Sequence, residues 1–285
     1  MRPEVPRRNY RLVALDLDGT LLNDAGEVSR EDAAALARFA LAGGILVLAS
    51  GRMTDNIRPF YDALGLDGPT IAYNGAMVRE SQREGGGIIL HTPLPVRYAD
   101  ALLDYTRAAR LQLNYYLDET LYSRDDPALR PYADLYSRQT GAVFHFLPDL
   151  ERFRGREPTK LLIVADPPQR DALYEVWRKR WGAEVTVMRT NPEYLEFFHR
   201  EAGKGRALEA LAAHYGVDRS LTLAFGDNHN DVSMMQWAGC GVAVANAREE
   251  AKAAADWVSP LTNNESAVGE ALRRLMGWQA GSPRD

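Results

Sequence analysis

The stretch from Leu12 to Leu22, Leu-Val-Ala-Leu-Asp-Leu-Asp-Gly-Thr-Leu-Leu, decides the fold of this 285-residue chain. Its first four residues are apolar, which predicts a buried β-strand. Alternation along a strand would place Asp16 and Asp18 on one face at its carboxyl end, and Gly19 would allow a tight turn. Two neighbouring carboxylates after an apolar run are costly unless a cation lies between them. The stretch therefore predicts either two solvated acids at a strand end or half of a cation site.

Length and composition are those of a soluble globular protein with one large domain or two modest ones. Apolar residues make up 46% of the chain and charged residues 26%. No apolar run approaches the roughly 20 residues that are needed to cross a bilayer. The charged residues 1–10 lack the apolar segment of a secretory signal, and the single cysteine, Cys240, excludes an internal disulfide. These features predict a cytoplasmic protein.

The charge pattern argues against nucleic acid as a partner. The formal net charge is −5, and no lysine-rich or arginine-rich run of the kind that follows a phosphate backbone occurs. Lysine is rare and occurs only at positions 160, 179, 204 and 252. We expect neither nucleic acid nor a membrane as a partner.

Strand-like and helical stretches alternate after the opening strand. Apolar runs at 45–49 and 69–73 are separated by helical stretches, which predicts a parallel sheet with helices on both faces, an α/β fold of the doubly wound, Rossmann-like kind. In such sheets, ligands bind beyond the carboxyl ends of the strands. Polar residues at these predicted ends are Asp16, Asp18, Ser50 and Asn74.

The pattern changes near Ser81 and returns near Tyr194. Strand-like pieces between them flank two or three helical stretches, which predicts an inserted α+β domain, a sheet with helices on one face. We therefore expect a core domain of residues 1–82 and 190–285 and an inserted domain of residues 83–189. The stretch Leu195-Glu196-Phe197-Phe198 is predicted to be a strand of the core. Residues 84–189 carry 15 basic and 15 acidic residues, so this stretch is neutral.

Two further motifs appear where the strand and helix order returns. Gly226-Asp227-Asn228-His229-Asn230-Asp231 again places carboxylates directly after an apolar strand, and Gly203-Lys204-Gly205 stands at the predicted start of a helix. Because lysine is rare in this chain, its presence there is not explained by composition. An ammonium is a compact charge that suits a phosphate oxygen. The motifs predict the second half of a site.

In this order the motifs resemble the haloacid dehalogenase-like (HAD) phosphatase superfamily, and specifically its Cof-type branch with a large α/β cap. The matching residues are Asp16-Leu17-Asp18-Gly19-Thr20, Ser50 within Ala-Ser-Gly-Arg, Lys204 and Gly226-Asp227-x-x-Asn230-Asp231. Asn74-Gly75-Ala76 and residues 242–247 are also similar to stretches of that branch. The inserted segment matches the family's cap in position and size.

The resemblance implies a Mg²⁺-dependent phosphatase that acts on small phosphorylated metabolites, such as sugar phosphates or phosphorylated cofactors. Asp16 would be the nucleophile that forms an aspartyl-phosphate, and Asp18 would be the general acid and base. The metal ligands would be Asp16, the backbone carbonyl of Asp18, and Asp227.

The resemblance also implies which residues bind the phosphate. These are Ser50, Gly51, Lys204 and Asn230, which would supply fixed donors and positive charge. Asp231, together with Asn230, would orient Lys204 and a metal-bound water.

Three more residues have two possible roles each. Arg52 either contacts phosphate or substrate, or pairs with a nearby acid. Asn74 either contributes to the site or only forms an Asn-Gly turn. Arg124, considered with Tyr116 and Tyr122, either faces the core site and helps to choose the leaving group, or belongs to an ordinary cap surface.

Two alternative functions remain open at this point. A phosphomutase on the same core would need a basic cap pocket for a second phosphate, whereas the stretch 84–189 is neutral. A non-catalytic phosphometabolite sensor would not need both Asp16 and Asp18. The histidines share no metal-ligand spacing, so a zinc site is not expected. Monomer and homodimer are both compatible with the sequence.

Overall fold

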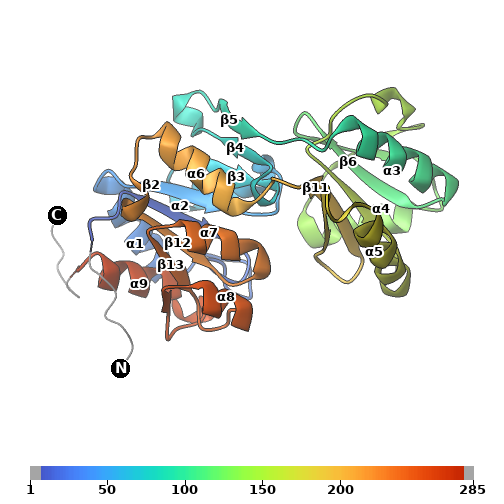
Figure 1. Ribbon diagram of the computed structural model, residues 1–285. Coiled ribbons are helices and arrows are strands. Elements are labelled where there is room, and N and C mark those ends of the chain that lie inside the picture. Colours follow the sequence, from blue (N-terminus) through green and yellow to red (C-terminus); the bar gives the residue numbers. More distant parts are fainter. Residues whose placement is uncertain (1–7, 279–285) are drawn as a thin grey trace. The chain divides into compact units, whose positions relative to one another are not determined.

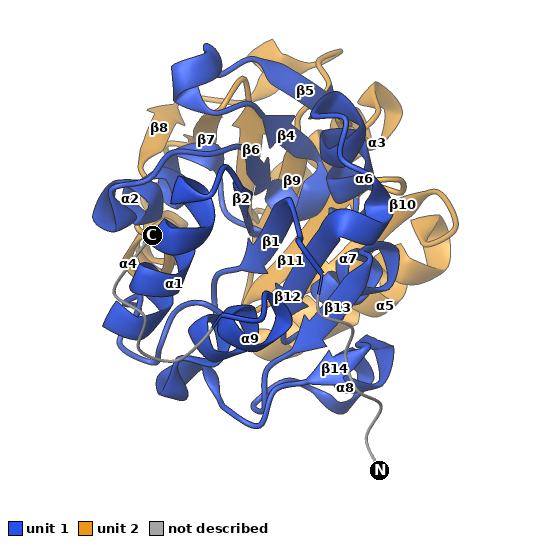
Figure 2. Ribbon diagram, turned by 90° about the vertical axis from the view of Figure 1, so that its left-hand side faces the viewer, with its two compact units in different colours: residues 1–90, 203–285 blue, residues 91–202 orange. Residues whose placement is uncertain are grey.

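The computed structural model describes residues 8–278. Residues 1–7 and 279–285 lie outside the described residues. Most of the stretch 1–10, from which no secretory signal is predicted, therefore lies outside them as well. The chain divides into two compact units, which Figure 2 shows in different colours. Residues 1–90 and 203–285 form the first, here called the core unit, and residues 91–202 form the second, the inserted unit. No helix in the described part of the chain is long and apolar enough to span a membrane.

The core unit is built on an eight-stranded sheet. From one edge to the other, its strands are β14 (Trp257–Val258), β13 (Cys240–Ala243), β12 (Thr222–Gly226), β1 (Leu12–Asp16), β2 (Ile45–Ala49), β3 (Thr70–Ala72), β4 (Met77–Arg79) and β5 (Ile88–His91). The strands from β14 to β3 pair in parallel, and β4 is antiparallel to β3. The predicted opening strand, β1, is therefore central in the sheet.

Helices cover both faces of the core sheet. They are α1 (Arg30–Leu41), α2 (Thr54–Leu64), α6 (Lys204–His214), α7 (Val232–Trp237), α8 (Glu249–Ala254) and α9 (Ala267–Leu275). Leu12 and Ala14 of β1 pack in one apolar cluster with residues of α6 and α7. Alternation turns the equally buried Val13 and Leu15 toward the opposite face. Figure 1 shows α6 beside α7 and α1 beside α9. The predicted doubly wound α/β core is confirmed.

Short 3₁₀ helices occur at several junctions. They are η1 (Tyr73–Gly75), η2 (Gln82–Glu84), η3 (Glu151–Phe153), η4 (Arg219–Leu221), η5 (His229–Asp231) and η6 (Asn263–Glu265).

The inserted unit contains a six-stranded sheet and three α-helices in the described residues. Its strands, in order, are β10 (Val185–Arg189), β11 (Tyr194–His199), β9 (Lys160–Val164), β6 (Gln112–Leu117), β7 (Thr120–Arg124) and β8 (Phe144–Leu147). Its helices are α3 (Val96–Ala108), α4 (Arg130–Thr140) and α5 (Pro167–Trp181). Most neighbouring strands are antiparallel, and only β7 and β8 pair in parallel. The unit has the predicted α+β class.

The sequence predicted that all helices of the inserted unit lie on one face of its sheet. In the structure they lie on both faces. Tyr115 of β6 belongs to the apolar cluster that contains Leu102 of α3 and Trp177 of α5. The next residue, Tyr116, points to the opposite face, where its hydroxyl donates to Tyr136 of α4 at 2.6 Å. The prediction is therefore wrong for α4, because helical periodicity does not specify which face of a sheet a helix covers.

The strand predicted at 195–198, which the sequence assigned to the core, belongs to the inserted unit. It forms β11, which pairs antiparallel with both β9 and β10. Its Glu196 is buried and accepts a bond from Lys160 of β9 at 2.9 Å. An apolar run does not specify which sheet it joins, so only the pairing could decide. The units accordingly divide after residues 90 and 202, whereas the sequence predicted 82 and 189.

Candidate active site

Neighbouring parallel strands of the core sheet end in the residues that the sequence singled out. Asp16 is the last residue of β1 and is paired in register with Ala49 of β2, directly before Ser50. Asp227 follows β12, the other neighbour of β1. Because these strands run in parallel, their ends meet at one edge of the sheet. The fold therefore brings Asp16 between the loops that carry Ser50 and Asp227.

Lys204 is the centre of the hydrogen bonds at this edge. Lys204 is the first residue of α6, and its side chain is fully buried. Its Nζ donates to Asp16 Oδ1 at 2.5 Å and to Asp231 Oδ1 at 2.6 Å. Asp231 is also fully buried, and its Oδ2 accepts the backbone N–H groups of Asp227 and Asn228, each at 3.1 Å. Lys204 thus joins the nucleophile candidate to the loop that follows β12.

Burial and mutual charge shift the pKa values of this cluster. Burial, followed by the charge of Asp231, raises the pKa of Asp16 well above its ordinary value, although Lys204 opposes this. Burial lowers the pKa of Lys204, but the carboxylates of Asp16 and Asp231 outweigh burial and raise it above its ordinary value. Lys204 therefore carries its charge at neutral pH, and both Asp16 and Asp231 accept hydrogen bonds from it.

Asp227 lies against the turn that follows β1. The Thr20 hydroxyl donates to Asp227 Oδ1 at 3.2 Å. Gly19 has a φ of 85°, which residues with a side chain rarely adopt, and a Cβ there would lie 2.8 Å from Asp227 Oδ2. Burial, and then the charge of Asp231, raises the pKa of Asp227 to about 6. The carboxylate is thus held close to the Asp16 turn in a setting that disfavours its charge.

The acidic residues of this cluster fit a divalent cation. Carboxylate oxygens of Asp16, Asp227 and Asp231 lie within 4.8 Å of one another. Three carboxylates outnumber the single ammonium of Lys204, so the ionised cluster carries excess negative charge in a poorly solvated place. The oxygen-only donor set is the kind that Mg²⁺ takes. Asp231 already uses both of its oxygens, which is consistent with a supporting role rather than direct ligation.

Asp18 differs from Asp16 in its surroundings. Strand β1 ends at Asp16, so Asp18 lies in the following turn, and the expectation that both acids belong to the strand is wrong for Asp18. Its side chain is 59% exposed and accepts a forked bond from Arg52, from Nε at 3.0 Å and from Nη2 at 2.6 Å. Of the two possible roles of Arg52, the structure shows the pairing with an acid.

The loop after β2 is tied to two other segments of the site. Ser50 is buried, and its Oγ accepts the backbone N–H of Arg52 at 3.2 Å. Asn74 lies against Gly51, because a Cβ on Gly51 would lie 3.0 Å from Asn74 Oδ1. The same oxygen accepts a bond from Asn230 Nδ2 at 3.0 Å. Asn74 therefore belongs to this cluster and does more than form a turn.

Two supporting residues were not recognised from the sequence. Thr20 lies within the matched motif, but no role was expected for its bond to Asp227. Asn246 donates to the backbone carbonyl of Gly19 at 2.8 Å and accepts the backbone N–H of Asn263 at 2.9 Å. Asn246 lies in the stretch 242–247, whose similarity to the family could have pointed to it. Both residues hold the turn that carries Asp18.

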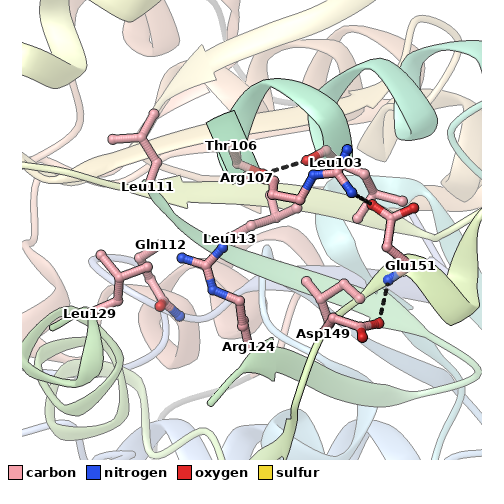
Figure 3. Close-up of a pocket in the computed structure, with 11 residues that line it drawn as sticks. Leu103, Thr106, Arg107, Leu111, Gln112, Leu113, Arg124, Leu129, Asp149 and Glu151 are labelled. Carbon is pink, nitrogen blue, oxygen red and sulfur yellow. Dashed lines mark hydrogen bonds and ion pairs between the residues drawn. The ribbon is translucent and has the colours of Figure 1, made fainter. Parts of the chain in front are cut away.

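The three candidates in the inserted unit do not share one face of its sheet. Tyr122 is opposite Tyr115 and packs on Phe153, with ring centroids 4.7 Å apart, whereas Tyr116 points to the other face. Arg124 pairs with Asp126 at 2.8 Å and lines a cavity of about 40 Å³. Figure 3 shows its guanidinium close to the side chains of the first residues of β6. A cavity of this volume holds a few water molecules, not a metabolite. A role of these residues in specificity stays a prediction.

Known proteins resemble this chain over most of its length. The model of the haloacid dehalogenase-like hydrolase family matches residues 13–272. YxeH of Bacillus subtilis is 32% identical over 274 residues, which cover 94% of this chain and 98% of YxeH. YitU of the same bacterium, a 5-amino-6-(5-phospho-D-ribitylamino)uracil phosphatase, is 30% identical, with 92% and 96% covered. The crystal structure of TM0651 from Thermotoga maritima matches with a TM-score of 0.84 at 34% identity, covering 93% of this chain and 97% of TM0651. The chain therefore belongs to the haloacid dehalogenase-like hydrolases, in their Cof-type branch, and is a phosphatase.

Proposed function

We propose that this phosphatase hydrolyses small phosphorylated metabolites with Mg²⁺ as its cofactor, through an aspartyl-phosphate on Asp16. The observation that carries the proposal is the buried Lys204 bonded to both Asp16 and Asp231 at the carboxyl end of β1. YitU, by its name, acts on a small phosphate ester, which supports this substrate class. We propose a phosphorylated metabolite, and not a nucleic acid, as the partner.

Asp16 is suited to attack phosphorus because Lys204 holds its carboxylate in one orientation. In the first step, an oxygen of Asp16 bonds to phosphorus, the ester bond breaks, and the leaving oxygen takes a proton from Asp18. In the second step, Asp18 removes a proton from water, the water oxygen bonds to phosphorus, and the bond between phosphorus and the Asp16 oxygen breaks. Inorganic phosphate leaves, and both carboxyl groups return to their starting forms.

The phosphate would be held by donors that the fold leaves available. An ammonium has three N–H donors, and Lys204 uses two of them on carboxylates. Ser50 Oγ accepts from the Arg52 N–H, so its own O–H remains to donate to a phosphate oxygen. Gly51 and Asn230 complete the proposed phosphate contacts. Donors fixed in this way stabilise the charge that develops during phosphoryl transfer.

The forked bond from Arg52 uses both carboxyl oxygens of Asp18 as acceptors. A carboxylate accepts two such bonds, whereas a protonated carboxyl group must turn one oxygen to donate. The ionised form is the one that activates water in the second step. Acting as the acid in the first step therefore requires Asp18 to loosen this bond.

The proposed metal ligands are Asp16, the backbone carbonyl of Asp18, and Asp227, with Asp231 in the supporting position. When bound, Mg²⁺ would neutralise the repulsion between the Asp16 carboxylate and a phosphate dianion. The excess of carboxylates over lysine at this site is what such a cation would balance.

Hydrolysis of p-nitrophenyl phosphate tests the mechanism. We expect activity with Mg²⁺, loss of activity with EDTA, and loss of activity in Asp16→Asn. The matched control is Asp62→Asn, because Asp62 is 66% exposed and its change should leave activity intact. Activity that survives in Asp16→Asn, or that ignores EDTA, would contradict the proposal. A screen of phosphorylated metabolites then identifies the substrate.

A further inference from the structure

We infer that the Tyr73–Gly75 turn is a positioning device for the phosphate-binding loops, and that Asn74 is its key positioning residue. The inference rests on the proposed function, because the loops that the turn contacts are those proposed to bind the phosphate. It assigns a role to the Asn-Gly pair, which the mechanism does not use.

The backbone of this turn is strained. Tyr73, Asn74 and Gly75 have φ values of 51°, 55° and 95° in succession. Asparagine tolerates this left-handed region, but a bulky residue such as tyrosine rarely adopts it. Tyr73 is nevertheless fully buried there. Such a conformation persists only where the surroundings hold it in place, and it is concentrated at functional sites.

Two backbone hydrogen bonds join this turn to the loop after β2. The N–H of Tyr73 donates to the carbonyl of Arg52, and the N–H of Asn74 donates to the carbonyl of Ser50, each at 3.0 Å. The loop that carries the proposed phosphate donor Ser50 is therefore fixed to the turn at two points, with Gly51 between them.

The Asn74 side chain connects this loop to the one after β12. Asn74 is 8% exposed, and its Oδ1 accepts the Nδ2 donor of Asn230 at 3.0 Å. The amide also lies close to Gly51, where an added Cβ would be 3.0 Å from Oδ1 and 3.2 Å from Nδ2. The two loops are therefore held at a fixed separation by one buried amide.

Gly75 places the same turn against the start of α6. A Cβ on Gly75 would lie 2.3 Å from the carbonyl carbon and oxygen of Gly203 and 2.8 Å from the backbone nitrogen of Lys204. These are backbone atoms, which cannot move aside as the end of a side chain can. The turn therefore contacts the segments that carry Ser50, Asn230 and Lys204, which are three of the proposed phosphate contacts.

The decisive variant is Asn74→Gly, because glycine accepts the positive φ and only the amide is lost. We expect kcat for p-nitrophenyl phosphate to fall roughly tenfold to a hundredfold, as small misplacements of reacting groups do. The melting temperature should stay within about 3 °C of the unchanged protein, because lost strain offsets lost contacts. Inorganic phosphate should also become a weaker competitive inhibitor.

A double variant separates positioning from general damage. If Asn74 acts through Asn230, Asn74→Gly combined with Asn230→Ala should lose no more activity than the worse single variant. Losses that multiply, or an Asn74→Gly enzyme with unchanged kcat, would overturn the inference.

Gly65→Ala is the matched control for Gly75→Ala. Gly65 also has a positive φ, 63°, but a Cβ there meets nothing within 4 Å. Both changes strain the backbone, and only Gly75→Ala pushes on the Lys204 segment. We expect Gly65→Ala to keep full activity and Gly75→Ala to lose it; equal activities would overturn the role of Gly75.

Asp16→Asn distinguishes the two levels of inference. If Asp16→Asn is as active as the unchanged protein, the proposed function itself fails. If Asp16→Asn is inactive while Asn74→Gly behaves as the unchanged protein, only the positioning role fails.

Discussion

At the scale of single residues, one buried ammonium is hydrogen-bonded to two buried carboxylates. Lys204 holds both Asp16 and Asp231 with short bonds, and all three side chains are removed from water. Taking charges out of water is costly, and the cost is offset only while the partners stay together. The same contacts that position the proposed nucleophile are therefore also a point at which the fold is vulnerable.

Lys204→Ala should abolish phosphatase activity and lower the free energy of unfolding. The change leaves two carboxylates buried without a cation, a loss of about 3–5 kcal/mol in comparable cases. Urea unfolding and p-nitrophenyl phosphate hydrolysis measure the two effects. Lys252→Ala is the matched control, because Lys252 pairs with the exposed Glu249, and such a surface pair is worth at most about 1 kcal/mol. Equal stability of the two variants would contradict this reasoning.

The raised pKa of Asp227, about 6, makes the effect of Mg²⁺ on stability depend on pH. An acid with a raised folded-state pKa contributes stability at low pH, and that contribution is lost as pH rises through the folded-state pKa. Above pH 6 the ionised Asp227 carboxylate should therefore lower the stability of the metal-free protein, and a bound cation should restore it. Below pH 6, protons compete with the cation for the carboxylate.

We expect 10 mM Mg²⁺, a concentration on the order of those that saturate weak oxygen sites, to raise the melting temperature more at pH 7.5 than at pH 5. Differential scanning fluorimetry with and without EDTA measures the shift. Asp227→Asn should remove most of the shift at both pH values. The same shift at pH 5 and pH 7.5 would show that Asp227 does not titrate in this range.

At the scale of elements, the inserted unit depends on a buried ion pair between β9 and β11. Lys160 Nζ lies 2.9 Å from Glu196 Oε2, and Thr190 donates to the other oxygen of Glu196 at 2.7 Å. Burial lowers the pKa of Lys160, but the negative charge of Glu196 outweighs this and raises it. Lys160 therefore keeps its charge while the strands are paired.

Removing one member of this pair should cost more than removing both. Lys160→Met leaves Glu196 buried and uncompensated, which costs about 3–5 kcal/mol in comparable cases, whereas apolar replacement of both members is often nearly neutral. Chemical unfolding of Lys160→Met, Glu196→Leu and the double variant measures the coupling. Additive losses would contradict the pairing.

At the scale of the whole molecule, the two units have separate sheets and separate apolar clusters. The limits of the inserted unit depend on β11, which lies between β9 and β10 in its sheet although it follows both in the chain. A segment that ends at residue 189 would therefore leave β10 without its partner strand.

We expect a fragment of residues 91–202 to unfold cooperatively on heating and a fragment of residues 83–189 not to. The first contains all six strands of the sheet, and the second lacks the strand that joins β10 to β9. Circular dichroism during a thermal scan compares the two fragments directly. Cooperative unfolding of the shorter fragment would show that β11 is dispensable.

The sequence by itself determined the α/β class of the core and the order of the site motifs. These features are local, because each site residue stands at the end of an apolar run or at the start of a helix, as Asp16 and Lys204 do. Parallel strands then bring such ends together at one edge by geometry alone. For that reason Lys204 and Asp16, 188 residues apart in the chain, come close enough to share a hydrogen bond.

Only the tertiary structure decided the pairings between distant segments that no local pattern encodes. The forked bond from Arg52 to Asp18, the amide contact between Asn74 and Asn230, and the place of β11 in the second sheet belong to this group. An apolar run shows that a strand is buried but not against which partner, and a polar residue shows that a bond is needed but not to what. Register and loop geometry make that choice, because they depend on the whole packed chain.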